Sequence, residues 1–242
     1  MNDREIDELL SGAKLPEPPS AETLGRIADS IAGSIQPVRP LPLGGMLAGA
    51  VALICAVVAM AGAAVLGFSG IARMTVLERA LVFLTLGVAV LAAASELVSA
   101  MIPGSRRRFS SSGLLAAAGL CLAVVLAVSF RDYHTTHFVH AGLVCLAIGL
   151  LHSMITGLLS WLVLRRGFAV DAVSAGLAAG TLAGLVGVSI LELHCANFQA
   201  VHVLVWHLGV LLVSGGLGAL CGRWSASTAL NRDSASSRDN RG

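Results

Sequence analysis

Charged residues are scarce in this chain of 242 residues: they make up 12% of it, whereas 56% is hydrophobic. A soluble domain of this length has too small a core to bury so much apolar surface. Six apolar runs reach the roughly 20 residues that a membrane-spanning helix needs, and they are continuous, which excludes the alternating strands of a barrel. They cover residues 44–70, 81–101, 113–130, 141–164, 170–190 and 203–221. The predicted fold class is all-α: a polytopic membrane protein with a bundle of six transmembrane helices.

Several motifs of other protein classes are missing. The sequence has no nucleotide-binding loop, no serine nucleophile elbow and no paired carboxylates, so we expect no enzymatic activity. It has no evident inverted repeats and few polar residues within the apolar runs, which argues against a transporter. The first 40 residues are polar and lack an early apolar core, so no cleavable signal peptide is expected.

The distribution of arginine predicts the orientation in the membrane. Arginines gather before the first run, in the second and fourth loops and after the last run, and the other loops hold few. The first set comprises Arg26, Arg39, Arg106, Arg107, Arg108, Arg165, Arg166, Arg223, Arg232, Arg238 and Arg241, and the second set Arg73, Arg79 and Arg131. Because positive residues stay on the cytoplasmic side, both termini are predicted to be cytoplasmic.

The chain is therefore expected to have three parts: a cytoplasmic N-terminal tail (1–43), the transmembrane domain (44–222) and a disordered cytoplasmic C-terminal tail (223–242). The first tail is acidic, and an apolar stripe recurs in it at three- and four-residue spacing. The stripe consists of Leu24, Ile27, Ile31 and Ile35. Such a stripe either binds a partner helix or groove or lies on the membrane surface. Surface helices usually have a basic polar face, so the acidic setting favours a protein partner.

Glycines recur every fourth residue in the last two runs. They are Gly176, Gly180 and Gly184 in the fifth run, and Gly218 and Gly222 in the sixth. Small residues at this spacing allow two membrane helices to approach closely. The pattern predicts close helix packing and by itself indicates no chemistry.

Cysteine and histidine residues gather near the outer ends of the last three runs. Cys145 lies about one turn inside the fourth run, and Cys195 lies in the fifth loop beside His194 and His202, with His207 slightly deeper. A thiol pair with imidazoles suits the capture of a soft metal ion, or the two thiols can cycle with a disulfide. The sequence has no Cys-x-x-Cys motif. A permanent disulfide, or no contact between the cysteines, therefore stays open.

Two other functions remain as alternatives. In the first, the chain is a haem- or copper-binding membrane subunit of a redox complex, with His152 and His207 as the ligands. Helical rise places these two imidazoles at different depths, about 16 Å and 6 Å from the outer boundary, which disfavours this reading. In the second, the chain is a membrane scaffold with a permanent outer disulfide.

Specific stretches of the sequence resemble a known family. They are Pro37-Val-Arg-Pro-Leu-Pro42 before the first run, Cys145 in a leucine-rich helix that ends at Arg165-Arg-Gly167, and Leu193-His-Cys195 followed by Val203-Leu-Val-Trp-His-Leu-Gly209. In these the chain is similar to the NrsF-type membrane anti-sigma factors, six-span negative regulators of extracytoplasmic-function (ECF) sigma factors. The histidine-rich stretch from His134 to His140 departs from that pattern.

The resemblance implies a function, a partner and a sensor. The partner would be an ECF sigma factor, held at the cytoplasmic face of the bacterial inner membrane. Cys145 and Cys195 match the sensing thiols, and their reaction with a metal or an oxidant would release the sigma factor. The resemblance implies no required cofactor, only a transient metal ion at Cys145 and Cys195. It implies no direct contact with nucleic acid and no small-molecule substrate.

Overall fold

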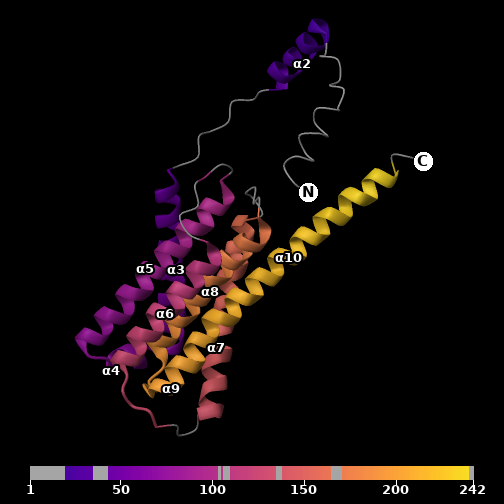
Figure 1. Cartoon of the computed structure of the whole chain (residues 1–242). Coiled ribbons are helices and arrows are strands. Elements are labelled where there is room, and N and C mark those ends of the chain that lie inside the picture. The colour runs from indigo at the N-terminus through magenta and orange to yellow at the C-terminus, as the bar shows by residue number, and fades with distance from the viewer. Residues whose placement is uncertain are drawn as a thin grey trace, which may run out of the picture. The chain divides into compact units, whose positions relative to one another are not determined.

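The computed structural model describes residues 20–34, 43–102, 105, 110–134, 138–164 and 171–239. Over these residues the chain is helical and has no strand, which confirms the predicted fold class. The elements, in chain order (Figure 1), are α2 (Ala21–Ser34), α3 (Gly44–Leu66), α4 (Ser69–Arg73), α5 (Val76–Met101), α6 (Ser111–Ser129), α7 (Phe138–Leu164), α8 (Ala172–His194), α9 (Ala200–His202), the π-helix η1 (Val203–His207) and α10 (Leu208–Asp239). The chain divides into two units, Met1–Leu41 and Pro42–Gly242.

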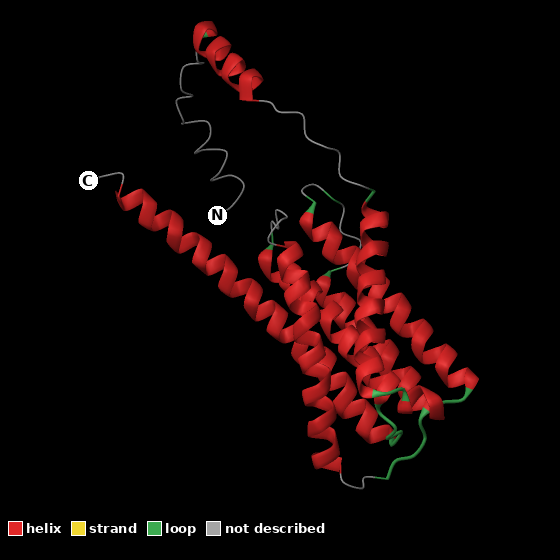
Figure 2. Ribbon diagram, turned by 180° about the vertical axis from the view of Figure 1, so that it is seen from behind, coloured by secondary structure: helices red, strands yellow, loops and turns green. Residues whose placement is uncertain are grey.

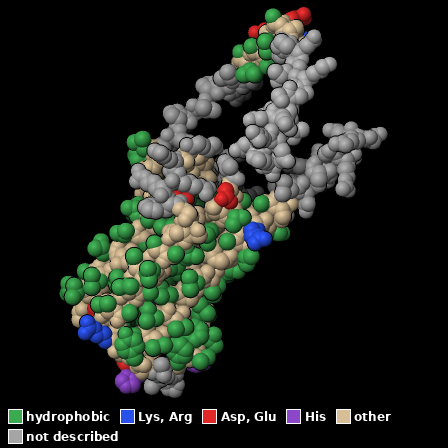
Figure 3. All heavy atoms as spheres, in the orientation of Figure 1, with side chains coloured by type: hydrophobic (Ala, Val, Ile, Leu, Met, Phe, Trp, Pro, Cys, Tyr) green, Lys and Arg blue, Asp and Glu red, His purple; other side chains and the backbone are tan. Residues whose placement is uncertain are grey.

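Six segments of the described chain are long and apolar enough to cross a membrane: α3, α5, α6, α7, α8 and the continuous segment Ala200–Ser227. Hydrophobic side chains cover the sides of these helices in Figure 3. A surface of this kind is stable in lipid, where each helix satisfies its own backbone hydrogen bonds. The protein is therefore a multi-pass membrane protein, as the sequence predicted.

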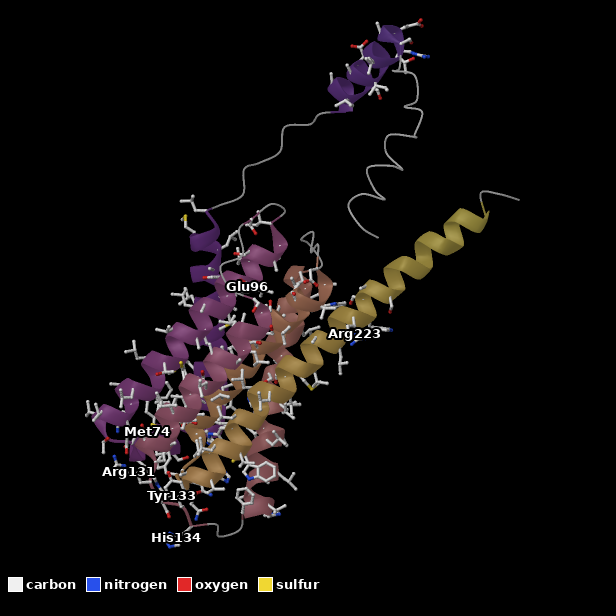
Figure 4. The ribbon with its side chains drawn as sticks, viewed as in Figure 1. Met74, Glu96, Arg131, Tyr133, His134 and Arg223 are labelled. Atoms are coloured by element: carbon white, nitrogen blue, oxygen red, sulfur yellow. The ribbon has the colours of Figure 1, made fainter. Side chains whose placement is uncertain are left out.

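Successive spans run in opposite directions, so α4 and α9 lie at one end of the bundle, called here the α4 end (Figure 1). Met74, Arg131, Tyr133 and His134 lie at this end, whereas Glu96 lies toward the other (Figure 4). Figure 2 shows the same end from behind, with its connecting loops in green. The α4 end contains the start of α7, the end of α8 and the start of the last span.

Helix α8 is the central element of the bundle. It contacts α3, α5, α6, α7 and α10, and 78% of its membrane-spanning window is buried, against 22% for α3. The expected glycine packing is present. A Cβ atom at Gly184 would come within 2.8 Å of the Leu211 Cα atom, and one at Gly222 within 3.0 Å of the Val173 Cα atom. Such short separations mean that the α8 and α10 backbones touch with no side chain between them.

Several spans extend beyond the apolar runs, and two of the extensions, in α5 and α8, contain charged residues. Helix α5 begins at Val76 because Thr75 and Glu78 form a capping box: the Glu78 carboxylate accepts a hydrogen bond from the Thr75 backbone N–H (2.7 Å), and the Thr75 hydroxyl accepts one from the Glu78 N–H (3.3 Å). Helix α8 continues beyond the run that ended at Ile190 and reaches His194. Glu192 therefore lies inside a helix rather than in the fifth loop, where the apolar pattern had put it.

Loop contacts hold the α4 end together. The backbone N–H of Ala200 donates a hydrogen bond to the Asp132 carbonyl (2.6 Å), and the rings of Phe130 and Phe198 stack with centroids 4.8 Å apart. The ring of Trp206 fills the space beside Gly142 of α7 and lies 5.4 Å from the Phe138 ring. These contacts fix the loop after α8 and the start of the last span against α6 and α7.

The two terminal regions are described separately. In the first unit, α2 presents the predicted apolar stripe: Leu24, Ile27 and Ile31 are about half exposed (52%, 49% and 54%). Ile35, the fourth residue of the stripe, lies outside the described residues. In the second unit, α10 continues as a helix to Asp239, through most of the segment that was expected to be a disordered tail.

Candidate metal and thiol site

The structure brings Cys145 and Cys195 together although 50 residues separate them. Their sulfur atoms are 3.6 Å apart, and both cysteines are free thiols. Cys145 comes from the second turn of α7, and Cys195 is the residue that ends α8. The described structure therefore places the predicted sensing thiols at one point, where α7 meets the end of α8.

Two of the three predicted histidines join the thiols. Cys145, Cys195, His202 and His207 each offer a ligand atom, and these four atoms all lie within 4.8 Å of one another. The Nε2 atom of His202 is 3.7 Å from the Cys195 sulfur, and the rings of His202 and His207 meet edge to face with centroids 5.6 Å apart. We call these four residues the Cys2His2 cluster.

A π-helical turn brings the two histidines onto one side. His202 and His207 are five residues apart, which in an α-helix separates side chains by about 140° around the axis. The chain instead forms the π-helix η1 from Val203 to His207, directly after His202. A π-helix has a wider turn with i→i+5 hydrogen bonds, so residues five apart lie much nearer the same side of the axis than in an α-helix. Such turns are rare and occur frequently at functional sites.

A buried carboxylate orients His207. The Nδ1–H of His207 donates a 2.7 Å hydrogen bond to Oε1 of Glu192, and both side chains are at most 1% exposed. Glu192 lies three residues before Cys195, at a spacing that puts both on the same face of the helix. The other nitrogen of His207, Nε2, is buried and has no hydrogen-bond partner among the described residues.

The electrostatics of the cluster favour a thiolate at Cys195. A hydrogen bond from the Cys145 thiol lowers the pKa of Cys195 most, and contacts with His202 and His207 lower it further, against the opposing effect of burial. Cys145 then acts as the hydrogen-bond donor of the sulfur pair. A thiolate is the form in which cysteine binds a metal or attacks an oxidant.

The remaining histidines lie elsewhere. His194, predicted as a metal ligand, donates a hydrogen bond from Nδ1 to the Gly67 carbonyl (3.1 Å) and is not part of the cluster. The ring of His152 packs where Gly62 of α3 leaves space, and the cluster does not include it. Of the two histidines that the haem alternative requires, the cluster therefore contains His207 only. His137 lies outside the described residues.

Sequence reasoning gave no role to Glu192. The sequence contains the spacing Glu192-x-x-Cys195, but a charged residue after Ile190 marks the end of the apolar run and predicts a loop. Its acceptance of the His207 hydrogen bond shows why a helix can carry a carboxylate this deep. A carboxylate one helical turn before a cysteine is the sequence signal that would have assigned Glu192 to the site.

A helical bundle of six spans that gathers two thiols and two imidazoles at one end defines a membrane protein with a thiol-based site. The chain belongs to the NrsF family, negative regulator of sigma F, whose model matches residues 31–226. The match includes the cluster and all six spans except the final residue of the sixth, and it confirms the resemblance read from the sequence. The family is one of regulators rather than enzymes. No curated protein and no solved structure matches the chain.

Proposed function

We propose that this protein is an anti-sigma factor of the bacterial inner membrane that holds an ECF sigma factor at the cytoplasmic face. Reaction of Cys145 and Cys195 with a metal ion or an oxidant releases it. The observation that carries the proposal is the meeting of the two thiols, 3.6 Å apart, in a chain of a family of sigma-factor regulators. The arginine distribution supports an orientation with both termini in the cytoplasm and the α4 end outside.

The central helix supplies a physical connection between the two faces. Cys195 ends α8, and α8 crosses the membrane in backbone contact with α10. A ligand that draws Cys195, Cys145 and His207 together acts on α7, α8 and the start of the last span at once. Close-packed helices respond to such a force by shifting between discrete arrangements. To change the sigma factor from 99% bound to 99% free, the signal must favour one state by about 5.5 kcal/mol.

The apolar stripe of α2 is the proposed binding site for the sigma factor. Leu24, Ile27 and Ile31 are exposed within their unit and lie beside acidic residues such as Glu22 and Asp29. An amphipathic helix with such a stripe fits an apolar groove on a protein partner. Ile35 extends the same spacing in the sequence.

We expect the sigma factor to co-purify with the full-length protein in mild detergent and to be lost when residues 1–36 are deleted. Ile27→Asp should weaken the complex at least about tenfold, because it removes an apolar anchor worth about 1.5–3 kcal/mol. Mass spectrometry identifies the bound protein, and a pull-down with purified sigma factor measures the affinity.

Gly33→Asp is the matched control, because it adds the same charge on the opposite face of α2, where the space beside Gly33 is open. It should bind like the wild type. Recovery of the sigma factor with the protein that lacks residues 1–36 would mean that the binding site lies outside the N-terminal tail. A preparation that carries haem and no sigma factor would instead support the redox-subunit alternative with His152 and His207.

A further inference from the structure

We propose that the Cys2His2 cluster binds a single divalent d10 ion, Zn²⁺ or Cd²⁺, with four protein ligands, and that Glu192 positions His207 for it. This inference deepens the proposed function, on which its regulatory meaning rests. The binding itself depends only on the geometry of Cys145, Cys195, His202 and His207.

The distances within the cluster match a tetrahedral site. With Zn–S bonds of about 2.3 Å and Zn–N bonds of about 2.0–2.1 Å, two sulfurs of a tetrahedron are about 3.8 Å apart and a sulfur and a nitrogen about 3.6 Å. The observed separations are 3.6 Å for the sulfurs and 3.7 Å for Cys195 Sγ and His202 Nε2. The three atoms that form these two edges thus need to move only a few tenths of an ångström, whereas the remaining pairs are known only to lie within 4.8 Å.

The donor set selects the ion. Two thiolates and two imidazoles in a tetrahedron are typical of zinc, and four protein ligands leave no open position for catalysis. Three of the four residues are buried, so a net charge left in the site is costly. Two thiolates neutralise a divalent ion, which leaves only the charge of the Glu192 carboxylate beside His207, whereas a monovalent ion leaves a second negative charge. The ion binds two thiolates and two neutral imidazole nitrogens, so any proton still on these four ligand atoms, such as that of the Cys145 thiol, passes to solvent, and no electron is transferred.

Glu192 supplies the outer part of the site. Its Oε1 atom fixes Nδ1 of His207 as the protonated nitrogen, which leaves the Nε2 lone pair for the ion. Carboxylate–histidine–zinc arrangements of this kind are common, and loss of the carboxylate typically weakens metal binding 10–100-fold. The buried His207 ring also contacts the Cys195 thiol, as expected for two ligands of one ion. Glu192 is thus a positioning residue and not itself a ligand.

The test is metal binding to the purified full-length protein, reduced and in mild detergent. Competition with a chromophoric chelator measures the Zn²⁺ affinity, and Co²⁺ reports the geometry. We expect one ion per chain, tetrahedral ligand-field bands and sulfur-to-cobalt charge transfer. Cys195→Ser should weaken Zn²⁺ binding at least 100-fold. Glu192→Gln should weaken it 10–100-fold and keep the tetrahedral spectrum, because it keeps the ligands but not the orienting charge.

Cys121→Ser is the control, because Cys121 is an exposed cysteine outside the cluster. It should bind as the wild type does. Wild-type protein that gives no tetrahedral Co²⁺ spectrum, or undiminished Zn²⁺ affinity in a His202→Ala, His207→Ala double variant, would overturn the four-ligand site. So would a Cu⁺ complex that forms in preference to Zn²⁺. These outcomes need no sigma factor. A protein that binds Zn²⁺ but never co-purifies with a sigma factor would overturn the proposed function alone.

Discussion

Serine at Cys145 or Cys195 is expected to leave repression of the sigma factor intact and to abolish its release. Both cysteines lie at the α4 end, and serine is close to cysteine in size, so the proposed binding of the sigma factor at the opposite end should be undisturbed. Serine removes the soft sulfur that a thiophilic ion prefers, and it also prevents a disulfide. Without a ligand, the about 5.5 kcal/mol needed to reverse the equilibrium is no longer available. In cells that carry either single variant, the inducer should therefore raise sigma-factor activity no higher than its level in untreated cells.

A transcriptional reporter for the sigma factor measures this effect in cells treated with Zn²⁺, Cd²⁺ or an oxidant. Cys121→Ser and Cys221→Ser are matched controls, since both are exposed cysteines outside the cluster, and both should respond normally. Immunoblots of the membrane fraction show whether each variant accumulates. Full induction of the serine variants at normal protein levels would refute the thiol mechanism. Release by an oxidant alone would favour a disulfide over the metal.

Local sequence patterns predicted the spans because lipid imposes a length and a composition on each helix. The boundaries depended on individual side chains. The Thr75–Glu78 capping box starts α5 before its apolar run, and the partner of Glu192 lets α8 continue past a charged residue. Glu192 and His207 are 15 residues apart, so no local pattern shows that each satisfies the other.

The sequence predicted the site only in part, because here too the deciding contacts join residues that are distant in the sequence. The thiols and two histidines belong to a group of cysteine and histidine residues that the sequence concentrates near one membrane face. The sequence does not show which members of that group contact one another. His202 joins the cluster and His194, beside Cys195 in sequence, does not, because the end of α8 turns His194 toward the Gly67 carbonyl. The π-helical turn that aligns His202 with His207 changes the helical period itself, and a pattern read at 3.6 residues per turn cannot find it.

Gly180→Ala is expected to destabilise the bundle, against the usual preference of helices for alanine. The new Cβ atom would lie 3.0 Å from the Gly218 Cα atom and 3.1 Å from the Gly215 Cα atom, and it would also meet the Ser214 carbonyl. These atoms belong to the α10 backbone and cannot rotate away, so the two helices must separate. Overpacking of this kind typically costs about 1–3 kcal/mol. Thermal unfolding in detergent should therefore show a lower midpoint for this variant.

Gly87→Ala provides the matched comparison, because Gly87 lies inside α5 with open space around it. Alanine there should stabilise the helix by up to about 1 kcal/mol.

The same pair of variants tests the coupling between the two membrane faces. Gly180 touches α10 far from the cluster in sequence, so Gly180→Ala should leave Zn²⁺ affinity of the isolated protein within about threefold of wild type, a difference of roughly 0.6 kcal/mol. If α8 and α10 carry the signal, that variant nevertheless changes the metal concentration that releases the sigma factor. An unchanged threshold in a measurably destabilised protein would mean that the signal travels through α7 instead.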